Sequence, residues 1–353
     1  MTPVALTLVL PTLMLLISSF NTLSLRRPSD ESEPFDGSVA VLLPVRNEEE
    51  NVLELVSSLK KQMGIARVSF HFLDDNSSDA TFTLITQATK SDKRFSITHG
   101  DELATGWLGK PYALQQALEK SSSDVVVVID ADVRLEAHAL VSAIGLMKSR
   151  HLSFVSAYPR QIALSLSERL IQPLLQWSWL STVPLAISER SLNPAFAVAN
   201  GQFFIAKRSA LEDIHGFSAV KEEIIDDIAL ARALLRAGHR GTVIDGSRIA
   251  SCRMYKSWPE LREGYSKSLR VAFGGVFGSF IAALFLFGVG VAPLSLGLFG
   301  YALIVGPRIV SASLTKGRIW DALLHPLSII LLVYLLGRSW VMRGRTQWKG
   351  RVV

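Results

Sequence analysis

Stretches of mostly apolar residues occupy both ends of the chain and flank a more polar central region. Residues 4–25 carry no charge, and about 20 apolar residues are enough for a helix to cross a bilayer. A cleaved signal peptide is the alternative, but it would carry Lys or Arg before the apolar run. Because Arg26 and Arg27 follow the run instead, we expect an uncleaved anchor over residues 1–27, with the N-terminus outside and the following chain in the cytoplasm.

A second apolar region lies near the C-terminus, in the stretches 271–306 and 321–336. The first stretch is long enough for two short crossings joined near residues 290–293, and residues 271–337 are expected to form a transmembrane region. Two crossings plus the last one would place the basic tail, residues 338–353, outside the cell. Because Lys and Arg are enriched on the cytoplasmic side, we favour a cytoplasmic tail, with the first stretch crossing once and carrying an interfacial piece.

Between these regions, a polar linker at residues 28–37 leads into alternating apolar runs and amphipathic segments. Short β-branched runs bounded by turn residues predict buried strands, and apolar residues three and four positions apart predict helices. The expected strands are 39–43, 68–73 and 125–129, and the expected helices are 48–61, 111–120 and 228–237. This alternation predicts an α/β domain with a mostly parallel sheet flanked by helices, over residues 38–270.

The segment 170–187 is apolar and uncharged, and it contains Trp177 and Trp179. Two interpretations are open, a buried helix or an interfacial helix that lies on the bilayer surface. Because Trp prefers the headgroup level of a membrane, we favour the interfacial helix.

Composition and charge narrow the class of protein. The formal net charge is +6, but the excess Lys and Arg gather near the apolar regions, where topology and anionic lipids account for them. No nucleic-acid-binding motif is present, and we expect no nucleic-acid partner. The single Cys252 excludes an intramolecular disulfide, which suits a cytoplasmic domain. The sequence has no Gly-x-Gly-x-x-Gly and no Walker loop, which argues against a dinucleotide fold and a P-loop.

Two aspartates, Asp130 and Asp132, directly follow the expected strand 125–129. Ligands bind at the carboxyl ends of strands in open α/β sheets. Two carboxylates at this position can bind a hard divalent cation that also contacts phosphate oxygens. Asp-x-Asp pairs are common, and a solvated strand end is the alternative for this pair taken alone.

Five motifs occur in the order seen in family 2 glycosyltransferases with the GT-A fold, and residues 38–270 resemble that family. The motifs are Pro44-Val-Arg-Asn-Glu-Glu49, Asp74-Asp-Asn-Ser-Ser-Asp79, Gly109-Lys110 followed by Ala113, Asp130-Ala-Asp132, and Asp226-Asp227. The chain is most similar to the carotenoid (diaponeurosporenoate-type) and hopene-associated glycosyltransferases, membrane enzymes that glycosylate isoprenoid lipids. Support for this narrower resemblance comes from Gly106-Trp-Leu-Gly-Lys-Pro111, Arg253-Met-Tyr255 and Trp348-Lys-Gly-Arg351.

The resemblance implies a UDP-sugar donor and assigns residues to it. The turn that contains Pro44, Arg46 and Glu48 would hold the uridine. Asp75 would accept a hydrogen bond from the uracil N3–H, which requires an acceptor at that position. Lys110 would contact the nucleotide or its phosphates, with an ordinary exposed lysine as the alternative.

The resemblance also implies a divalent cation, Mg²⁺ or Mn²⁺, and a catalytic base. Asp130 would contact the ribose or the cation, and Asp132 would bind the cation directly. Asp227 would be the base, since a carboxylate in the first turn of a helix is kept ionised by the helix dipole. The family has a Glu-Asp pair here, so the role of Asp226 is open. One base without a second carboxylate nucleophile implies a single displacement with inversion, by analogy with glycosidases.

Two further segments carry weaker assignments. Lys267-Ser-Leu-Arg270-Val271 is a degenerate form of the family's Gln/Arg-x-x-Arg-Trp motif, and Arg270 would clamp the diphosphate or be a positive charge next to the membrane. Asn200 and Gly201 resemble the segment that faces the transferred sugar, where glycine permits close backbone approach. A plain turn is the alternative for Gly201.

Taken together, the sequence predicts a multi-pass protein of the cell membrane with a cytoplasmic GT-A domain. Its expected activity is transfer of a hexose, glucose being favoured, from a UDP-sugar to a hydroxyl or carboxyl group of an isoprenoid-type lipid. A synthase that loads sugar onto a polyprenyl phosphate is the enzymatic alternative. An inactive lipid-binding scaffold is the alternative from another class, but Asp75, Asp130, Asp132 and Asp227 are all present.

Overall fold

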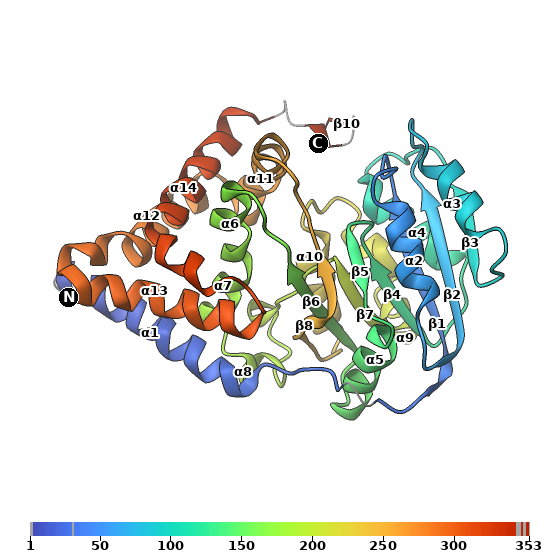
Figure 1. Cartoon of the computed structure of the whole chain (residues 1–353), viewed down its shortest axis with the longest axis horizontal. Coiled ribbons are helices and arrows are strands. Elements are labelled where there is room, and N and C mark those ends of the chain that lie inside the picture. The colour runs from blue at the N-terminus through green and yellow to red at the C-terminus, as the bar shows by residue number, and fades with distance from the viewer. Residues whose placement is uncertain (1–2, 30–31, 344–346, 349–350, 353) are drawn as a thin grey trace. The chain divides into compact units, whose positions relative to one another are not determined.

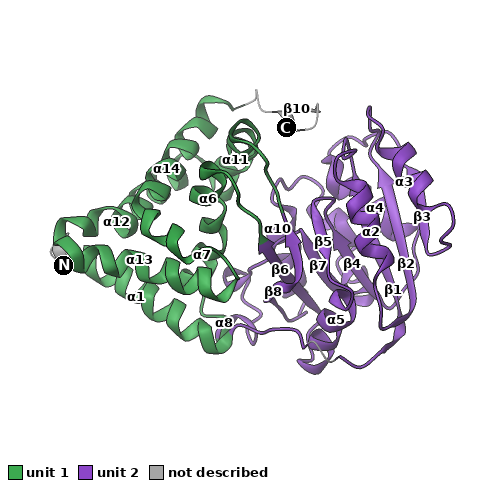
Figure 2. Cartoon of the chain, viewed as in Figure 1, with its two compact units in different colours: residues 1–24, 161–186, 253–353 green, residues 25–160, 187–252 purple. Residues whose placement is uncertain are grey.

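The structure, a computed structural model, describes residues 3–29, 32–343, 347–348 and 351–352. The chain forms two compact units, coloured separately in Figure 2. The sheet unit comprises residues 25–160 and 187–252, and the helical unit comprises residues 1–24, 161–186 and 253–353. This division differs from the expected domain boundaries, because residues 161–186 and 253–270 group with the apolar helices instead of the sheet.

The sheet unit is built on an eight-stranded sheet, counted over the described residues, with the order β3-β2-β1-β4-β7-β6-β8-β5 (Figure 1). Its strands are β1 Phe35–Val45, β2 Ile65–Asp74, β3 Phe95–His99, β4 Val125–Ile129, β5 Val133–Leu135, β6 Phe154–Gln161, β7 Phe203–Lys207 and β8 Gly241–Cys252. Strands β1 to β4 are parallel, whereas β7 is antiparallel to both β4 and β6, and β5 is antiparallel to β8. The expected α/β fold with a sheet flanked by helices is therefore confirmed, and β1 to β4 form the parallel half of that sheet.

Helices and short 3₁₀ turns surround this sheet. Those of the sheet unit are α2 Val52–Lys60, α3 Thr81–Thr89, α4 Gly109–Glu119, α5 Ala139–Ser149, η1 Pro194–Phe196, α9 Arg208–Glu212, η2 Gly216–Val220 and α10 Asp226–Arg236. A short helix, α8 Leu185–Ser188, spans a chain boundary between the units. The apolar side chains of β4 and β7 pack with those of α4, η2 and α10 into one core that includes Val126, Phe204, Phe217 and Leu234. This packing fixes α4 and α10 against the sheet.

Several element boundaries differ from those expected. Helix α2 begins at Val52 instead of residue 48, and the preceding turn is held by the Glu48 N–H, which donates to Thr81 Oγ1 at 2.7 Å. Helix α4 begins at Gly109, and α10 begins at Asp226 instead of residue 228. Strand β1 continues through Pro44 to Val45. As a result, Lys110, Asp226 and Asp227 all lie in first turns of helices.

The helical unit contains the apolar helices. Its elements are α1 Pro3–Ser24, α6 Leu166–Ile171, α7 Pro173–Thr182, α11 Trp258–Ala272, α12 Gly275–Gly290, η3 Ala292–Leu296, α13 Gly297–Leu314, η4 Ile319–Leu324, α14 His325–Val341, and the short strands β9 Gln347–Trp348 and β10 Arg351–Val352. Three helical stretches among the described residues are long and apolar enough to cross a membrane, namely Thr7–Ser24, Gly275–Leu314 and Ile319–Val341. Of the expected basic tail, residues 344–346, 349–350 and 353 lie outside the described residues.

The segment for which an interfacial helix was favoured packs inside the helical unit. Helix α7 contacts α1 and α13, and Trp177 and Trp179 are 3% and 8% exposed. Trp177 lies in an apolar core with Leu261 and Leu335. Burial of both indoles fits the alternative interpretation, a buried helix, because an interfacial Trp would keep its polar edge exposed.

The chain that follows α1 is bound to the sheet unit by ion pairs. Arg26 Nε lies 2.7 Å from Glu189 Oε2, and Arg27 Nε lies 3.0 Å from Asp245 Oδ2. Arg150 also pairs with Glu189. Both acids are nearly buried, so Arg26 and Arg27 have a structural function in addition to the topological one that their positions in the sequence suggest.

Candidate active site at the carboxyl ends of the parallel strands

The carboxyl ends of β1, β2 and β4 meet at one edge of the sheet because these strands are parallel neighbours. The segments that follow them, residues 46–51, 75–80 and 130–132, therefore share that edge. Helices α4 and α10 join the site through Lys110 and Asp227, whose contacts are described below. Most of the polar residues singled out in the sequence thus come together in the sheet unit.

Asp130 and Asp132 lie directly after β4, and their surroundings differ. The Asp130 N–H donates to the Gln202 carbonyl at 3.2 Å, and its carboxylate pairs with Lys110. Burial, and after it repulsion from Asp130, raises the pKa of Asp132 to about 6. A hydrogen bond from the Cys252 thiol acts in the opposite direction and lowers this pKa. Glu48 adds to this repulsion, which places its charge close to the pair.

The two aspartates fit a divalent cation that also has non-protein ligands. Asp132 Oδ1 is buried without a hydrogen-bond partner in the described part of the chain, and such an oxygen is available to a metal. Within the described residues, no three His, Cys, Asp or Glu side chains form a group that could hold a metal by themselves. Mg²⁺ commonly takes one or two carboxylates and completes its shell with substrate phosphates and water, which agrees with a site of two aspartates.

Lys110 connects these aspartates to the start of α10. Its Nζ lies 2.7 Å from Asp130 Oδ1 and 4.0 Å from Asp226 Oδ2. Although burial opposes the charge, Asp130, Asp226 and Asp227 together raise the pKa of Lys110 well above its usual value. The lysine is therefore an ion-paired member of the site and not the exposed surface residue that was its alternative.

Asp227 is held by two backbone donors at the start of α10. Its Oδ2 accepts from the Gly201 N–H at 2.8 Å, and its Oδ1 accepts from the Ile228 N–H at 2.7 Å. Burial and then repulsion from Asp226 raise the pKa of Asp227 to about 6, whereas Lys110 and the two N–H groups act in the opposite direction. The carboxylate is fixed in orientation and more basic than an ordinary aspartate.

The turn of Asn200 and Gly201 brings the backbone close to Lys110 and Asp227. A Cβ added at Gly201 would lie 3.1 Å from Lys110 Nζ and 3.3 Å from Asp227 Cβ, so a larger residue would fit only if these neighbours shifted by a few tenths of an ångström. Glycine permits the close approach without that shift. Asn200 Oδ1 accepts from the Gln202 N–H at 2.8 Å, and the Asn200 N–H donates to Ser156 Oγ at 2.7 Å. Asn200 therefore stabilises the turn, a function that the sequence pattern did not indicate.

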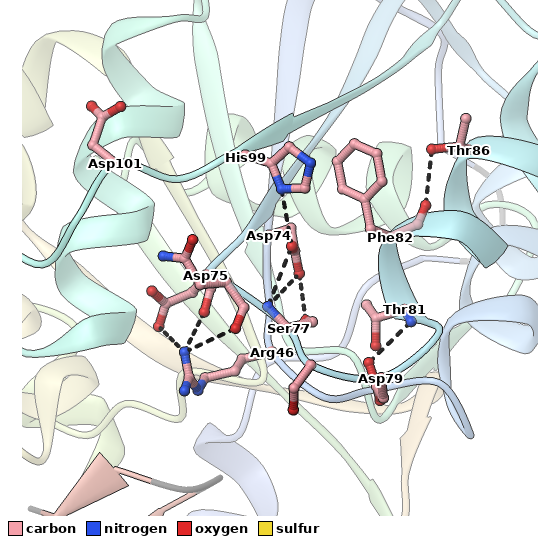
Figure 3. Close-up of polar contacts among 12 residues, drawn as sticks. Arg46, Asp74, Asp75, Ser77, Asp79, Thr81, Phe82, Thr86, His99 and Asp101 are labelled. Carbon is pink, nitrogen blue, oxygen red and sulfur yellow. Dashed lines mark hydrogen bonds and ion pairs between the residues drawn. The ribbon is translucent and has the colours of Figure 1, made fainter.

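Arg46 and Asp75 face one another at the ends of β1 and β2 (Figure 3). Arg46 Nη1 donates to the carbonyl oxygen of Asp75 and, at 3.3 Å, to that of Asn76, and it lies 3.9 Å from Asp75 Oδ2. The Asp75 N–H donates to the Val45 carbonyl at 2.8 Å. Arg46 therefore holds the loop that carries Asp75.

A neighbouring cluster around Asp74 was not identified as part of the site from the sequence. Asp74 accepts from the N–H and the hydroxyl of Ser77 and lies 3.4 Å from His99 Nδ1. The His99 ring stacks on Phe82 with 3.8 Å between centroids, as Figure 3 shows. The one signal in the sequence was the position of His99 at the end of an apolar alternation, which is too common to assign.

The remaining expected residues are placed as follows. Pro44 pairs with Leu73 inside the sheet, and Glu48 Oε2 accepts from Asn51 Nδ2 at 2.8 Å. Arg270 lies on α11 and belongs to the helical unit, whereas the other expected site residues belong to the sheet unit. Its backbone N–H donates to Ser339 Oγ at 3.0 Å.

Comparisons with known proteins bear on this geometry. The family model for glycosyl transferase family 2 matches residues 40–215. A 4,4'-diaponeurosporenoate glycosyltransferase of Staphylococcus haemolyticus (strain JCSC1435) is 27% identical over 66% of this chain and 61% of its own length. Its counterpart in Staphylococcus aureus (strain MRSA252) is 25% identical over 89% of this chain and 88% of its own length.

A solved structure shares the fold of nearly the whole chain. It is described as mannosyltransferase PcManGT from Pyrobaculum calidifontis in complex with GDP-Man and Mn²⁺. The match covers 96% of this chain and 97% of the other, with a TM-score of 0.58 and 18% sequence identity. At this identity the likeness concerns the fold.

Proposed function

Because the chain is a family 2 glycosyltransferase, with the family's domain at residues 40–215, we propose that it moves a hexose from a UDP-sugar to an isoprenoid-type lipid. The accepting group is a hydroxyl or a carboxyl, the anomeric configuration is inverted, and glucose is the sugar to test first. Relatives named 4,4'-diaponeurosporenoate glycosyltransferase support a lipid acceptor, and one of them aligns over 89% of this chain. Three apolar helices that could cross a membrane support the same class of acceptor.

The observation that carries the proposal is the carboxylate of Asp227, which two backbone N–H groups hold in a fixed orientation. Its pKa of about 6 leaves it ionised at neutral pH while making it a stronger base than an ordinary aspartate. Such a group can take the proton of an acceptor hydroxyl as the oxygen attacks the anomeric carbon. Attack from the side opposite the leaving diphosphate inverts the configuration. An acceptor carboxyl is already ionised near neutral pH and would need Asp227 much less.

The residues at the other strand ends are proposed to bind the donor. Asp75, on the loop held by Arg46, is positioned to accept from the uracil N3–H, and Pro44 and Glu48 shape the same turn. Asp132 and Asp130 would hold Mg²⁺ or Mn²⁺. A bound cation would neutralise the charge that develops on the departing diphosphate.

Four residues complete the proposed arrangement. Asn200, Gly201 and Asp226 are proposed to lie beside the transferred sugar. The bond from the Gly201 N–H to Asp227 and the 4.0 Å approach of Asp226 to Lys110 support this proposal. Arg270 is proposed to clamp the diphosphate, for which a guanidinium fork is suited. Replacing Arg270 by Gln should then weaken UDP binding in the intact enzyme.

We further propose that the protein is a multi-pass protein of the cell membrane, with the GT-A domain on the cytoplasmic face. Positively charged residues concentrate on that face of membrane proteins, and Arg26, Arg27 and the basic tail follow apolar segments.

The function is tested by incubating membranes that contain the enzyme with radiolabelled UDP-glucose, extracting the lipids and determining the mass of the labelled product. We expect a glycosylated isoprenoid lipid that disappears in EDTA, returns with Mn²⁺ or Mg²⁺, and is absent with the Asp132→Ala variant. Label on a polyprenyl phosphate would assign the alternative synthase activity. Full transfer in EDTA would contradict the proposed role of the metal. Labelling of lipid by GDP-mannose but not by UDP-glucose would contradict the proposed UDP-sugar donor.

A further inference from the structure

The positive charge of Lys110 is stabilised by nearby carboxylates and not by the dipole of its own helix. Lys110 is in the first turn of α4, Gly109–Glu119, where the helix dipole disfavours a positive charge. The compensating contacts are the 2.7 Å pair with Asp130 Oδ1 and the 4.0 Å approach to Asp226 Oδ2. The ammonium therefore depends on Asp130 as its principal partner.

The surroundings of Lys110 leave its ammonium charged and enclosed. Besides its contacts with Asp130 and Asp226, the ammonium lies beside the turn that binds Asp227, whose Oδ2 accepts from the Gly201 N–H. The backbone at Gly201 closes one side, since a Cβ at that position would lie 3.1 Å from Nζ. Lys110 thus places its positive charge between the Asp-x-Asp pair and the start of α10.

A divalent cation on Asp130 and Asp132 would need the carboxylate that Lys110 already uses. Two cations beside Asp130 weaken one another's binding, because like charges a few ångströms apart repel strongly in a partly desolvated site. The Lys110 side chain ends in a compact charge on a flexible four-carbon stem, so it can move while its helix stays fixed. A diphosphate beside the cation would offer the ammonium new oxygen partners.

We propose that Lys110 and the divalent cation compete for Asp130, and that the arriving cation displaces the Lys110 ammonium towards the diphosphate of the donor. This inference rests on the metal and donor sites of the proposed function. It adds that binding of the cation and binding of the donor depend on one another. When no nucleotide is bound, Lys110 weakens binding of the cation. Once the cation is in place, Lys110 strengthens binding of the nucleotide. Cation and donor consequently bind best together.

The competition is tested by titrating Mn²⁺ into the purified full-length enzyme without nucleotide and following free Mn²⁺ by electron paramagnetic resonance. Lys110→Met and Lys110→Gln should bind Mn²⁺ about tenfold more tightly than the wild type, the order expected for removing one charge-assisted contact to Asp130. Lys110→Arg keeps the charge and should bind no more tightly than the wild type. Lys120→Met, at an exposed lysine just after the same helix, should match the wild type.

The second measurement is UDP affinity of the same variants at saturating Mn²⁺. Lys110→Met and Lys110→Gln should lose about tenfold in UDP affinity, the order of one lost charged contact, so the two affinities move in opposite directions. Unchanged or weaker Mn²⁺ binding in both folded variants would overturn the competition while leaving the proposed function intact. A wild-type enzyme that binds no Mn²⁺ with or without UDP would instead contradict the metal role, and this inference with it.

Discussion

Asp227 and Asp132 both have a pKa raised to about 6, and burial is the largest cause for each. Their hydrogen bonds separate their functions. Asp227 accepts from Gly201 and Ile228, which fixes the direction in which it can receive a proton. Asp132 keeps a buried oxygen without a partner among the described residues, which suits a metal ligand. The different hydrogen bonding of these two aspartates agrees with the roles proposed for them, a base at Asp227 and a metal ligand at Asp132.

The first residue-scale prediction concerns Asp227→Asn, a nearly isosteric change. With a hydroxyl acceptor, turnover should fall about 10²–10⁴-fold, the usual contribution of a general base, while UDP affinity is retained. The product of the wild-type enzyme should be β-linked when the donor is α-linked, as read from its anomeric NMR coupling. An α-linked product would rule out inversion, and a fully active variant would make Asp226 the next candidate for the base.

The second residue-scale prediction is a pH dependence. Asp227 accepts a proton only when ionised, so kcat/KM for a hydroxyl acceptor should be constant above neutral pH and fall as the pH drops through about 6. The fall should approach tenfold per pH unit below that value, because kcat/KM reports the free enzyme's base. A profile that stays flat down to pH 5 would contradict the assignment of Asp227 as the base.

The third residue-scale prediction concerns nucleotide choice. If Asp75 accepts from the uracil N3–H, UDP should inhibit far better than GDP or CDP. Asp75→Asn should weaken the binding of UDP by about 1.5–3 kcal/mol, the value of a charge-assisted hydrogen bond. Inhibition constants for the three nucleotides provide the measurement. Equal inhibition by all three nucleotides would contradict the proposal that Asp75 recognises uridine.

At the scale of elements, the site depends on where helices begin. Helix α10 starts at Asp226 and α4 at Gly109, so Asp227 and Lys110 reach the site from rigid first turns. Both helices pack through Leu114 and Leu234 into the core that also contains β4 and β7. The packing of these helices therefore controls the distance between base, lysine and Asp-x-Asp pair.

The element-scale prediction tests this support. Leu234 on α10 is fully buried, and Leu234→Ala should reduce the free energy of unfolding by about 2–5 kcal/mol, as for other buried leucines. Arg232→Ala on the exposed side of the same helix is the matched control and should change little. Thermal unfolding followed by circular dichroism provides the comparison, and equal stability of the two variants would show that α10 does not depend on this core.

At the scale of the whole molecule, apolar segments distant in the sequence form one unit. Helices α1, α7, α13 and α14 belong to it, although they come from both ends and from the middle of the chain. The sheet unit interrupts this helical unit twice. The apolar helices and the sheet unit are consequently interleaved along the chain, and removing either terminus would remove part of the helical core.

The molecule-scale prediction is integral membrane association. Three stretches long and apolar enough to span a bilayer should keep the full-length protein in the membrane pellet after alkaline carbonate washing, which releases peripheral proteins. Immunoblotting of pellet and supernatant gives the result. Release into the supernatant would contradict the transmembrane assignment and favour helices that lie on the surface.

The sequence by itself was sufficient for the family and for the segments that carry the expected site residues. Local patterns predicted β4, the Asp130-Ala-Asp132 strand end and the apolar termini, because strand burial and turn formation depend on neighbouring residues. The expected family 2 membership and GT-A-type fold are confirmed. The roles of the individual site residues stay predictions.

Only the tertiary structure decided the contacts between distant residues. The pairing of Lys110 with Asp130, the Gly201 N–H on Asp227 and the Arg46 contact with the Asp75 loop join segments that no local pattern relates. The same holds for the antiparallel half of the sheet and for Trp177, whose burial depends on packing within the helical unit. Local propensity sets which residues form strands and turns, whereas long-range packing sets which side chains meet and therefore which carboxylate becomes base, ligand or counter-ion.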